Sequence, residues 1–88
     1  MSEWRVVFTR QARKDAQRVA ASDMKERAAA LIAILREDPY RSPPPFDKLV
    51  GDLAGAYSRP INVLRRLVYQ VLDEERAVKV IRMWTHYE

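Results

Sequence analysis

The apolar residues of this chain change their spacing at a proline-rich segment, Pro39–Pro45. Before this segment, apolar positions recur every three or four residues, which is the spacing of one face of an α-helix. After it, runs of β-branched and aromatic residues have the character of strands. The chain has 88 residues, so too little follows the prolines to make a second domain. We therefore interpret the segment as a stiff loop within one domain, residues 1–88.

Two helices are predicted before the prolines. Thr9 is placed to cap the first helix, and its apolar positions are Ala12, Ala16, Val19 and Ala20. Asp23 and Glu26 have the spacing of a capping box at the start of the second helix. Because proline disfavours helical conformation in the residue before it, this helix must end before Pro39. The apolar stripe of the second helix consists of Met24, Ala28, Leu31, Ile32 and Leu35.

Four strand-like runs complete the pattern, and a polar turn, Asp73–Arg76, separates the last two. Phe46–Leu53 is ambiguous. The order β-α-α-β-β-β predicts an α+β fold, in which a two-helix hairpin packs on one face of a mostly antiparallel, twisted sheet. The four predicted strands are Trp4–Thr9, Tyr57–Val63, Arg65–Leu72 and Ala77–Tyr87.

Side chains alternate across a strand, so the predicted strand Arg65–Leu72 has two distinct faces. Leu67, Tyr69 and Val71 share one face, which we expect to pack against the helices. Arg66 then lies on the opposite, open face. Pro60 lacks the N–H that a ladder of hydrogen bonds needs, so the strand that contains it must be an edge strand or be bulged there.

Composition and charge narrow the functional classes. Hydrophobic residues make up 48% of the chain, which indicates a folded protein, and the absence of cysteine excludes disulfides, thiolate metal sites and cysteine nucleophiles. No apolar run has the length of a signal peptide or membrane span, so we expect a cytoplasmic protein. The net charge of +4 favours an anionic partner such as nucleic acid or an acidic polypeptide. The segment Tyr57–Leu72 concentrates this charge, with three arginines and no acid.

Asp47, Arg66 and the pair His86-Tyr87 are candidates for chemistry, but each also has an ordinary structural interpretation. An aspartate after a proline run is typical of a turn or cap. A lone arginine on an exposed sheet face is usually a solvated charge, and a terminal His-Tyr pair is usually a chain end. Taken singly, none of them indicates a function.

Three motifs in order resemble the YoeB/Txe branch of the RelE toxin family. They are the L-x-G-x-Y-S-R element at Leu53–Arg59, the R-L-V-Y element at Arg66–Tyr69, and the terminal His86-Tyr87. The resemblance is close over about half of the chain, and the predicted element order agrees with the family's fold. It implies the toxin of a type II toxin–antitoxin pair. It also implies a ribosome-dependent endoribonuclease that needs no metal and no cofactor and cleaves mRNA in the ribosomal A site.

In such a reaction the ribose 2′-hydroxyl attacks its adjacent phosphate, which requires a base, an acid and positive charge at the phosphorus. Carried over by position, the resemblance makes Asp47 the base and His86 the acid. Arg66 becomes the clamp on the scissile phosphate, and Tyr87 positions or stacks the substrate base. The residues assigned to RNA or phosphate binding are Lys48, Arg59 and Arg65.

Two positions depart from the family pattern. Asp47 stands where the family usually has glutamate, so its carboxylate reaches one methylene less far. A misplacement of about 1 Å can cost about 10²-fold in rate. Pro60 replaces the second arginine of the family's S-R-R element, a phosphate-binding residue there. A catalytically weakened homologue, which acts by binding its antitoxin and operator DNA, is therefore one alternative. A ParE-like gyrase inhibitor is another, although that branch does not need the His-Tyr ending.

The resemblance also implies partners. Besides the ribosome and mRNA, we expect a cognate antitoxin with an acidic segment, because a basic substrate groove must be masked in the resting cell. Family members often dimerise, alone or through the antitoxin, and the residues leave both arrangements open. They also leave the codon preference and the identity of the antitoxin undetermined.

Overall fold

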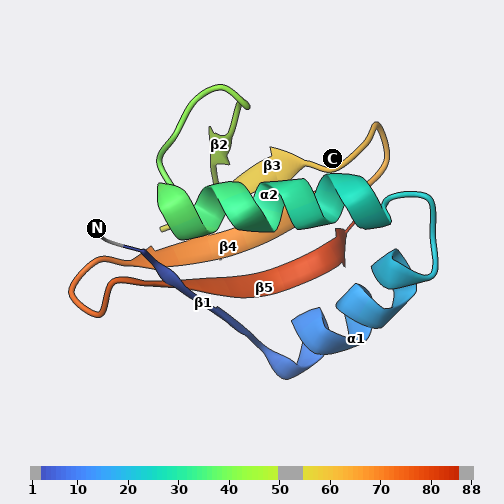
Figure 1. Cartoon of the computed structure of the whole chain (residues 1–88), viewed down its shortest axis with the longest axis horizontal. Helices are drawn as coiled ribbons and strands as arrows, with labels where there is room; N and C mark the ends of the chain where they lie inside the picture. The colour runs from blue at the N-terminus through green and yellow to red at the C-terminus, as the bar shows by residue number, and fades with distance from the viewer. Residues whose placement is uncertain (1–2, 50–54, 86–88) are drawn as a thin grey trace.

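The computed structural model describes residues 3–49 and 55–85, in which two helices lie beside a five-stranded sheet (Figure 1). The sheet order is β1-β5-β4-β3-β2, with β1 parallel to β5 and the other neighbours antiparallel. The predicted α+β fold is thereby confirmed. The helices are α1 (Arg10–Ala20) and α2 (Lys25–Glu37), and the strands are β1 (Arg5–Phe8), β2 (Asp47–Lys48), β3 (Ala56–Pro60), β4 (Arg66–Leu72) and β5 (Ala77–Thr85).

Apart from shifts of one residue at strand ends, the strands differ from the prediction at two places. The ambiguous segment contains a two-residue strand, β2, which pairs with Tyr57 and Ser58 of β3. β3 ends at Pro60 and not at Val63, because an Asn62 turn follows. The Asn62 side-chain oxygen accepts the backbone N–H groups of Leu64 and Arg65, each at 2.8 Å. Such side-chain acceptors compete with a strand ladder and close a turn.

The helix ends follow the predictions except at one cap. Thr9 caps α1, with its hydroxyl accepting the Ala12 N–H at 3.0 Å, and α2 ends at Glu37, before the proline. The capping box at Asp23 is wrong. The N-cap of α2 is Met24, which makes no side-chain cap bond. Ser22 joins the two helices instead: its hydroxyl donates to the Val19 carbonyl at 2.8 Å and accepts the Met24 N–H at 3.1 Å.

The main core lies between the helices and one face of the sheet (Figure 1). Leu67 and Tyr69 of β4 are fully buried in this core and Val71 is partly buried, as the alternation predicted. From the helices the core takes Ala12 and Val19 together with the predicted stripe of α2, which is Met24, Ala28, Leu31, Ile32 and Leu35. Neither helix in the described part of the chain has the length and apolar character needed to cross a membrane.

The other face of the sheet carries a second, smaller apolar cluster. It consists of Leu49, Ala56 and Val68, with Ile81 packed against them. Val68 is only 2% exposed. The face of the sheet that carries Arg66 is therefore partly covered by apolar side chains.

The pairing of β5 with β4 is irregular, and a side chain of α1 binds β5 next to the irregular part. This pairing shifts twice. Ile81 is an extra residue between Tyr69↔Val80 and Val68↔Arg82, and a second extra residue lies between Val68↔Arg82 and Arg66↔Thr85. Buried Asp15 of α1 accepts the Met83 N–H at 3.0 Å and Arg82 Nε at 2.8 Å. Burial raises the pKa of Asp15, but the hydrogen bonds from Arg82 and from backbone N–H groups outweigh it, so the pKa lies below its ordinary value.

Candidate functional site

Three neighbouring strands bring Asp47, Ser58 and Arg66 together on the face away from the helices. Asp47 of β2 is paired with Ser58 of β3, and directly opposed residues of antiparallel strands project to the same face. Arg66, at the start of β4, donates from Nη2 to Asp47 Oδ2 at 2.8 Å and from Nε to the Ser58 hydroxyl. Residues far apart in sequence thus form one continuous contact.

The two charged side chains of this contact differ in their exposure. The Asp47 side chain is 72% exposed, whereas that of Arg66 is 23% exposed and rests on the fully buried Ser58. Arginine has five N–H donors, and the hydrogen bonds found among the described residues use Nε and Nη2. The arrangement holds a guanidinium in place while a carboxylate beside it stays open to solvent. A fixed guanidinium suits an anionic oxygen, and an exposed carboxylate suits proton transfer.

Lys48 does not join this contact. It follows Asp47 in β2 and is paired with Tyr57, which packs against the helix-side core. Because successive side chains of a strand point to opposite faces, Lys48 projects away from the face that carries Asp47 and Arg66.

The structure places Arg59, which was expected to bind phosphate, in the interior of the protein. It is fully buried, and its donors are used within the chain. Nε donates to the Tyr69 hydroxyl at 2.8 Å, and Nη1 donates to the Pro44 carbonyl at 2.7 Å. Nη2 donates to the carbonyls of Pro39 and Arg41, at 3.0 and 2.8 Å. Each nitrogen of this guanidinium thus has a partner within the chain, and its burial argues against contact with a phosphate.

The local chemistry explains why a cation is buried there. Prolines have no N–H, so the carbonyls of the segment Pro39–Pro45 have few donors nearby, and buried carbonyls need partners. Arg59 supplies several donors from one planar group. Burial raises the pKa of the neighbouring Tyr69 hydroxyl, although the Arg59 charge and hydrogen bond act in the opposite direction. The proline-rich loop that Arg59 binds comes just before β2, which begins at Asp47. Arg59 therefore helps to position Asp47 through this loop.

The sequence and the fold match those of a known family of toxins. Residues 8–87 match the family described as "YoeB-like toxin of bacterial type II toxin-antitoxin system". The chain belongs to this family. The resemblance carried by the three sequence motifs is thereby confirmed.

Relatives in this family agree over almost their whole length. Toxin YoeB of Streptomyces coelicolor is 35% identical over 85 residues, which cover 94% of this chain and 99% of that protein. A YoeB/ParE toxin structure from Agrobacterium tumefaciens has a TM-score of 0.85 at 29% identity, covering 94% of this chain and 99% of that one. Two Staphylococcus aureus structures, a YoeB–YefM complex and a YoeB dimer, have TM-scores of 0.79 and 0.80. Each is 29% identical and covers 96% of this chain and 98% of the other.

The C-terminal candidates of the family pattern, His86 and Tyr87, lie outside the described residues. The strand that leads to them is described as far as Thr85, whose backbone is paired with Arg66. The remaining basic candidate, Arg65, precedes β4. Its guanidinium lies 4.5 Å from the ring centroid of Trp84, and that of Arg18 lies 4.5 Å from the same centroid.

Pro60, the second departure from the family pattern, is paired with Arg66 at the end of β3. β2 pairs only with Tyr57 and Ser58, so within the described residues the outer edge of β3 is uncovered at Pro60. The expectation that proline needs an edge position in its strand is met in this way.

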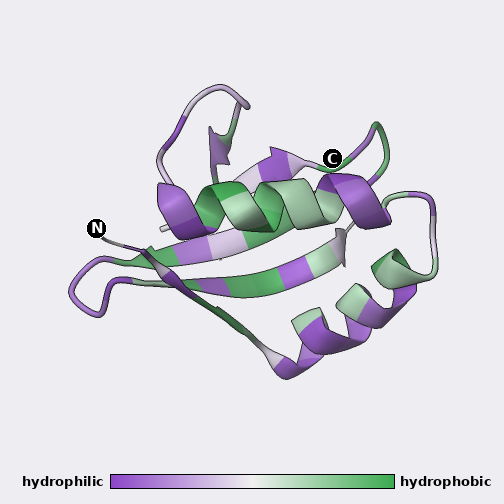
Figure 2. Ribbon diagram, in the orientation of Figure 1, coloured by the Kyte–Doolittle hydropathy of each residue, from purple (hydrophilic) through white to green (hydrophobic). Residues whose placement is uncertain are grey.

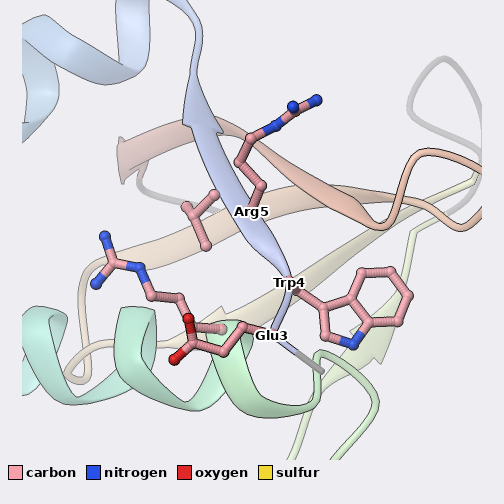
Figure 3. Close-up of a pocket in the computed structure, with 5 residues that line it drawn as sticks. Glu3, Trp4 and Arg5 are labelled. Atoms are coloured by element: carbon pink, nitrogen blue, oxygen red, sulfur yellow. The ribbon is translucent and has the colours of Figure 1, made fainter. Parts of the chain in front are cut away.

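Within the described residues, Asp47 and Arg66 lie on the surface of the protein. A pocket of about 350 Å³ lies at the start of β1. Figure 3 shows Glu3, Trp4 and Arg5, which line it. Val6 and Arg36 complete its lining, so no residue assigned to catalysis or phosphate binding contributes. Among the described residues, no group of three or more His, Cys, Asp or Glu side chains stands together as a metal site would require.

Proposed function

We propose that this toxin is a metal-independent endoribonuclease that cleaves mRNA on the ribosome. The observation that carries the proposal is the direct contact between Arg66 and Asp47 at 2.8 Å, on a strand face anchored by buried Ser58. A guanidinium and a carboxylate in contact are the phosphate clamp and the base that cleavage by a 2′-hydroxyl needs. Among the described residues, the two groups lie on a strand face at the surface, and this position suits a polymeric substrate.

In the proposed reaction, the 2′-hydroxyl gives its proton to Asp47 as its oxygen bonds to phosphorus. Arg66 binds the non-bridging phosphate oxygens and stabilises their added charge. The bond from phosphorus to the 5′-oxygen breaks, and His86 protonates that leaving oxygen. The products are a 2′,3′-cyclic phosphate and a 5′-hydroxyl. Tyr87 is assigned to positioning the base beside the scissile phosphate.

The ion pair also gives a physical reason for dependence on the ribosome. Without RNA, Asp47 and Arg66 bind each other, so an entering phosphate must compete for the Arg66 donor before the carboxylate is released. A flexible RNA pays a large entropic cost to do this in the correct orientation. A ribosome that already holds the mRNA in one conformation removes most of that cost.

Mapping of cleavage ends by primer extension tests this proposal. We expect purified toxin to cut an mRNA that is being translated, in the cytoplasmic extract where it is proposed to act, and to leave the same RNA intact when it is naked. An Arg66→Ala variant is expected to leave the translated RNA intact as well. Efficient, specific cutting of naked RNA would show that the ribosome is not required.

We further propose that the toxin is held inactive by a cognate antitoxin with an acidic segment. The Staphylococcus aureus YoeB–YefM complex supports this for a relative with the same fold, and the YoeB dimer from the same organism supports self-association. Neutralising the basic strand segment requires an acidic partner. Titration of the toxin with a candidate YefM-like antitoxin, with cleavage measured in the translating extract, tests this.

A second function is favoured by the two departures from the family pattern. Asp47 is one methylene shorter than glutamate, and Pro60 supplies no charge opposite Arg66. A toxin weakened in this way would act mainly by binding its antitoxin and, through the complex, operator DNA. Antitoxin binding without cleavage in the translating extract would identify this function.

A further inference from the structure

The outward side of α1 is rich in basic residues. Arg10, Arg13, Lys14 and Arg18 are all exposed, and we call these four residues the basic face of α1. Residues three and four apart lie on one side of a helix, and the buried residues of α1, Ala12, Asp15 and Val19, lie on the opposite side. Figure 2 shows the same division, with the outer side of α1 hydrophilic.

No acidic side chain neutralises the charges of this face within the described part of the chain. The ion pairs there join Arg41 to Glu37, Arg66 to Asp47 and Arg82 to Asp15, and none includes a residue of the basic face. The only acid of α1, Asp15, is buried and already bound to Arg82. Four like charges therefore lie within about 12 Å of helix, where neighbours at a spacing of four repel each other.

A stacked cluster joins this face to the strands of the candidate site. The guanidinium groups of Arg18 and Arg65 each lie 4.5 Å from the ring centroid of Trp84. Such contacts hold both cations in place. Arg65 is next to Arg66 in sequence, and Trp84 precedes the residue that pairs with Arg66. Fixed positive charge thus extends from the basic face to the start of β4.

The chemistry of the face points to a phosphate backbone. The centres of protein–protein interfaces are apolar and depleted in lysine, and the exposed positions of α1 offer no apolar side chain larger than that of Ala20. Phosphates are bound by arginine and lysine without regard to sequence. Unpaired bases need an open aromatic ring for stacking, but Trp84 is already stacked by two arginines. A base-paired helix, which displays phosphates and hides its bases, fits this face.

We propose that the basic face of α1 binds the phosphate backbone of a base-paired nucleic acid, at a site separate from Asp47 and Arg66. Only the biological source of that backbone rests on the proposed function, since a ribosome-dependent nuclease would meet it as folded ribosomal RNA. The contact adds affinity and orientation and takes no part in bond cleavage.

Fluorescence anisotropy with a 20-base-pair RNA hairpin, between about 50 and 200 mM salt, tests this with the full-length protein. The variant Arg13→Gln/Lys14→Gln removes two charges from the basic face and leaves the Trp84 stack untouched. The matched control, Lys25→Gln/Arg27→Gln, removes the same two residue types from exposed positions of α2. We expect the first variant to bind at least about tenfold more weakly at 100 mM salt, with the slope of log affinity against log salt reduced by about 1.5 to 2. We expect the control to bind within about twofold of the parent.

A DNA duplex of the same sequence forms the second arm. Stronger binding of RNA identifies an RNA source, and equal binding identifies phosphate charge as all that is read, so both results agree with the proposal. Equal losses in the two variants, or no loss in either, would overturn it. So would a variant that binds both duplexes normally but loses binding to polyglutamate, because the partner would then be an acidic protein. The binding result stands whether or not the parent cleaves mRNA, so it is distinguishable from failure of the proposed function.

Discussion

Two arginines on neighbouring strands, one on each side of the sheet, are used in opposite ways. Arg59 faces the helices, is fully buried, and gives its donors to Tyr69 and to carbonyls of the proline-rich loop. Arg66 lies on the other face, where it rests on Ser58 and meets an exposed carboxylate. The same residue type is a structural connector in one environment and a candidate phosphate ligand in the other. The number of donors already satisfied within the chain separates the two roles.

The largest expected effect on stability is at Arg59, on the face of the sheet that packs against the helices. Arg59→Met should lower the free energy of unfolding by about 3 kcal/mol or more, because several buried carbonyls lose their donor at once. Arg59→Lys should recover little of this, since a compact ammonium does not reproduce the planar arrangement of donors. Urea unfolding measures both. A loss under about 1 kcal/mol in Arg59→Met would mean that the loop carbonyls find other partners and that Arg59 is not a connector.

The next effect concerns the core beside Arg59. Leu67 is fully buried between the sheet and the helices, so Leu67→Ala should lower the free energy of unfolding by about 2–5 kcal/mol. Arg66, the residue before it, points to the opposite face of the sheet. The effects of substitution at these two positions therefore test which face of β4 packs against the helices. If urea unfolding shows only a small loss of stability in Leu67→Ala, then Leu67 does not face the helices and the assignment of the two faces is wrong.

A smaller, pH-dependent effect is expected at Asp15. Its pKa is lowered in the folded state, so its contribution to stability is present above the unfolded pKa of about 3.9. That contribution is lost as the pH falls through the lower folded value. The Asp15→Asn variant should therefore unfold at a lower temperature than the parent near neutral pH. The difference between the two melting temperatures should become smaller below about pH 4. A gap that is constant over this range would mean that the charge of Asp15 is not what holds the β5 bulge.

The smallest effects are expected when Asp47 and Pro60, the two departures from the family pattern, are changed to the family's residues. These variants test how the residues around Arg66 contribute to mRNA cleavage. Asp47→Glu should raise mRNA cleavage by up to about tenfold, because it restores one methylene of reach. Pro60→Arg should raise it by adding a cation opposite Arg66 in the register of β3 and β4. Pro60→Ala is the control for the change in backbone. If Asp47→Ala cleaves as well as the parent and neither reversion helps, the base lies elsewhere.

Elements set by local patterns could be predicted from the sequence. The cap at Thr9, the end of α2 before Pro39 and the inward face of Leu67 and Tyr69 depend on residues close together in the chain. The short strand β2 could not be predicted, because two residues have no periodicity and their pairing comes from β3. The cap at Asp23 failed because Ser22, one position earlier, already supplies the hydrogen bonds that join the helices.

The site was predicted in part for the same reason. The face of Arg66 followed from alternation along its own strand. The burial of Arg59 depends on a loop that folds back from 15 to 20 residues earlier in the chain, which alternation does not reveal. Asp15 was missed because its acceptor role exists only once β5 is bulged, 68 residues away. The sequence did contain one signal for the burial of Arg59. A proline-rich loop has few N–H donors of its own, so its buried carbonyls need a donor such as arginine from another part of the chain.

The central claim is that Arg66 is held for chemistry and not for folding, and one variant tests it directly. Arg66→Ala loses a hydrogen bond to Ser58 and an exposed ion pair, so we expect the free energy of unfolding to fall by only about 1 kcal/mol. In the same preparation, cleavage of translated mRNA should fall by about 100-fold or more, while Arg27→Ala, an exposed arginine of α2, cleaves like the parent. Cleavage that persists in a folded Arg66→Ala protein would contradict the account, as would a loss of cleavage no larger than the loss of folded protein.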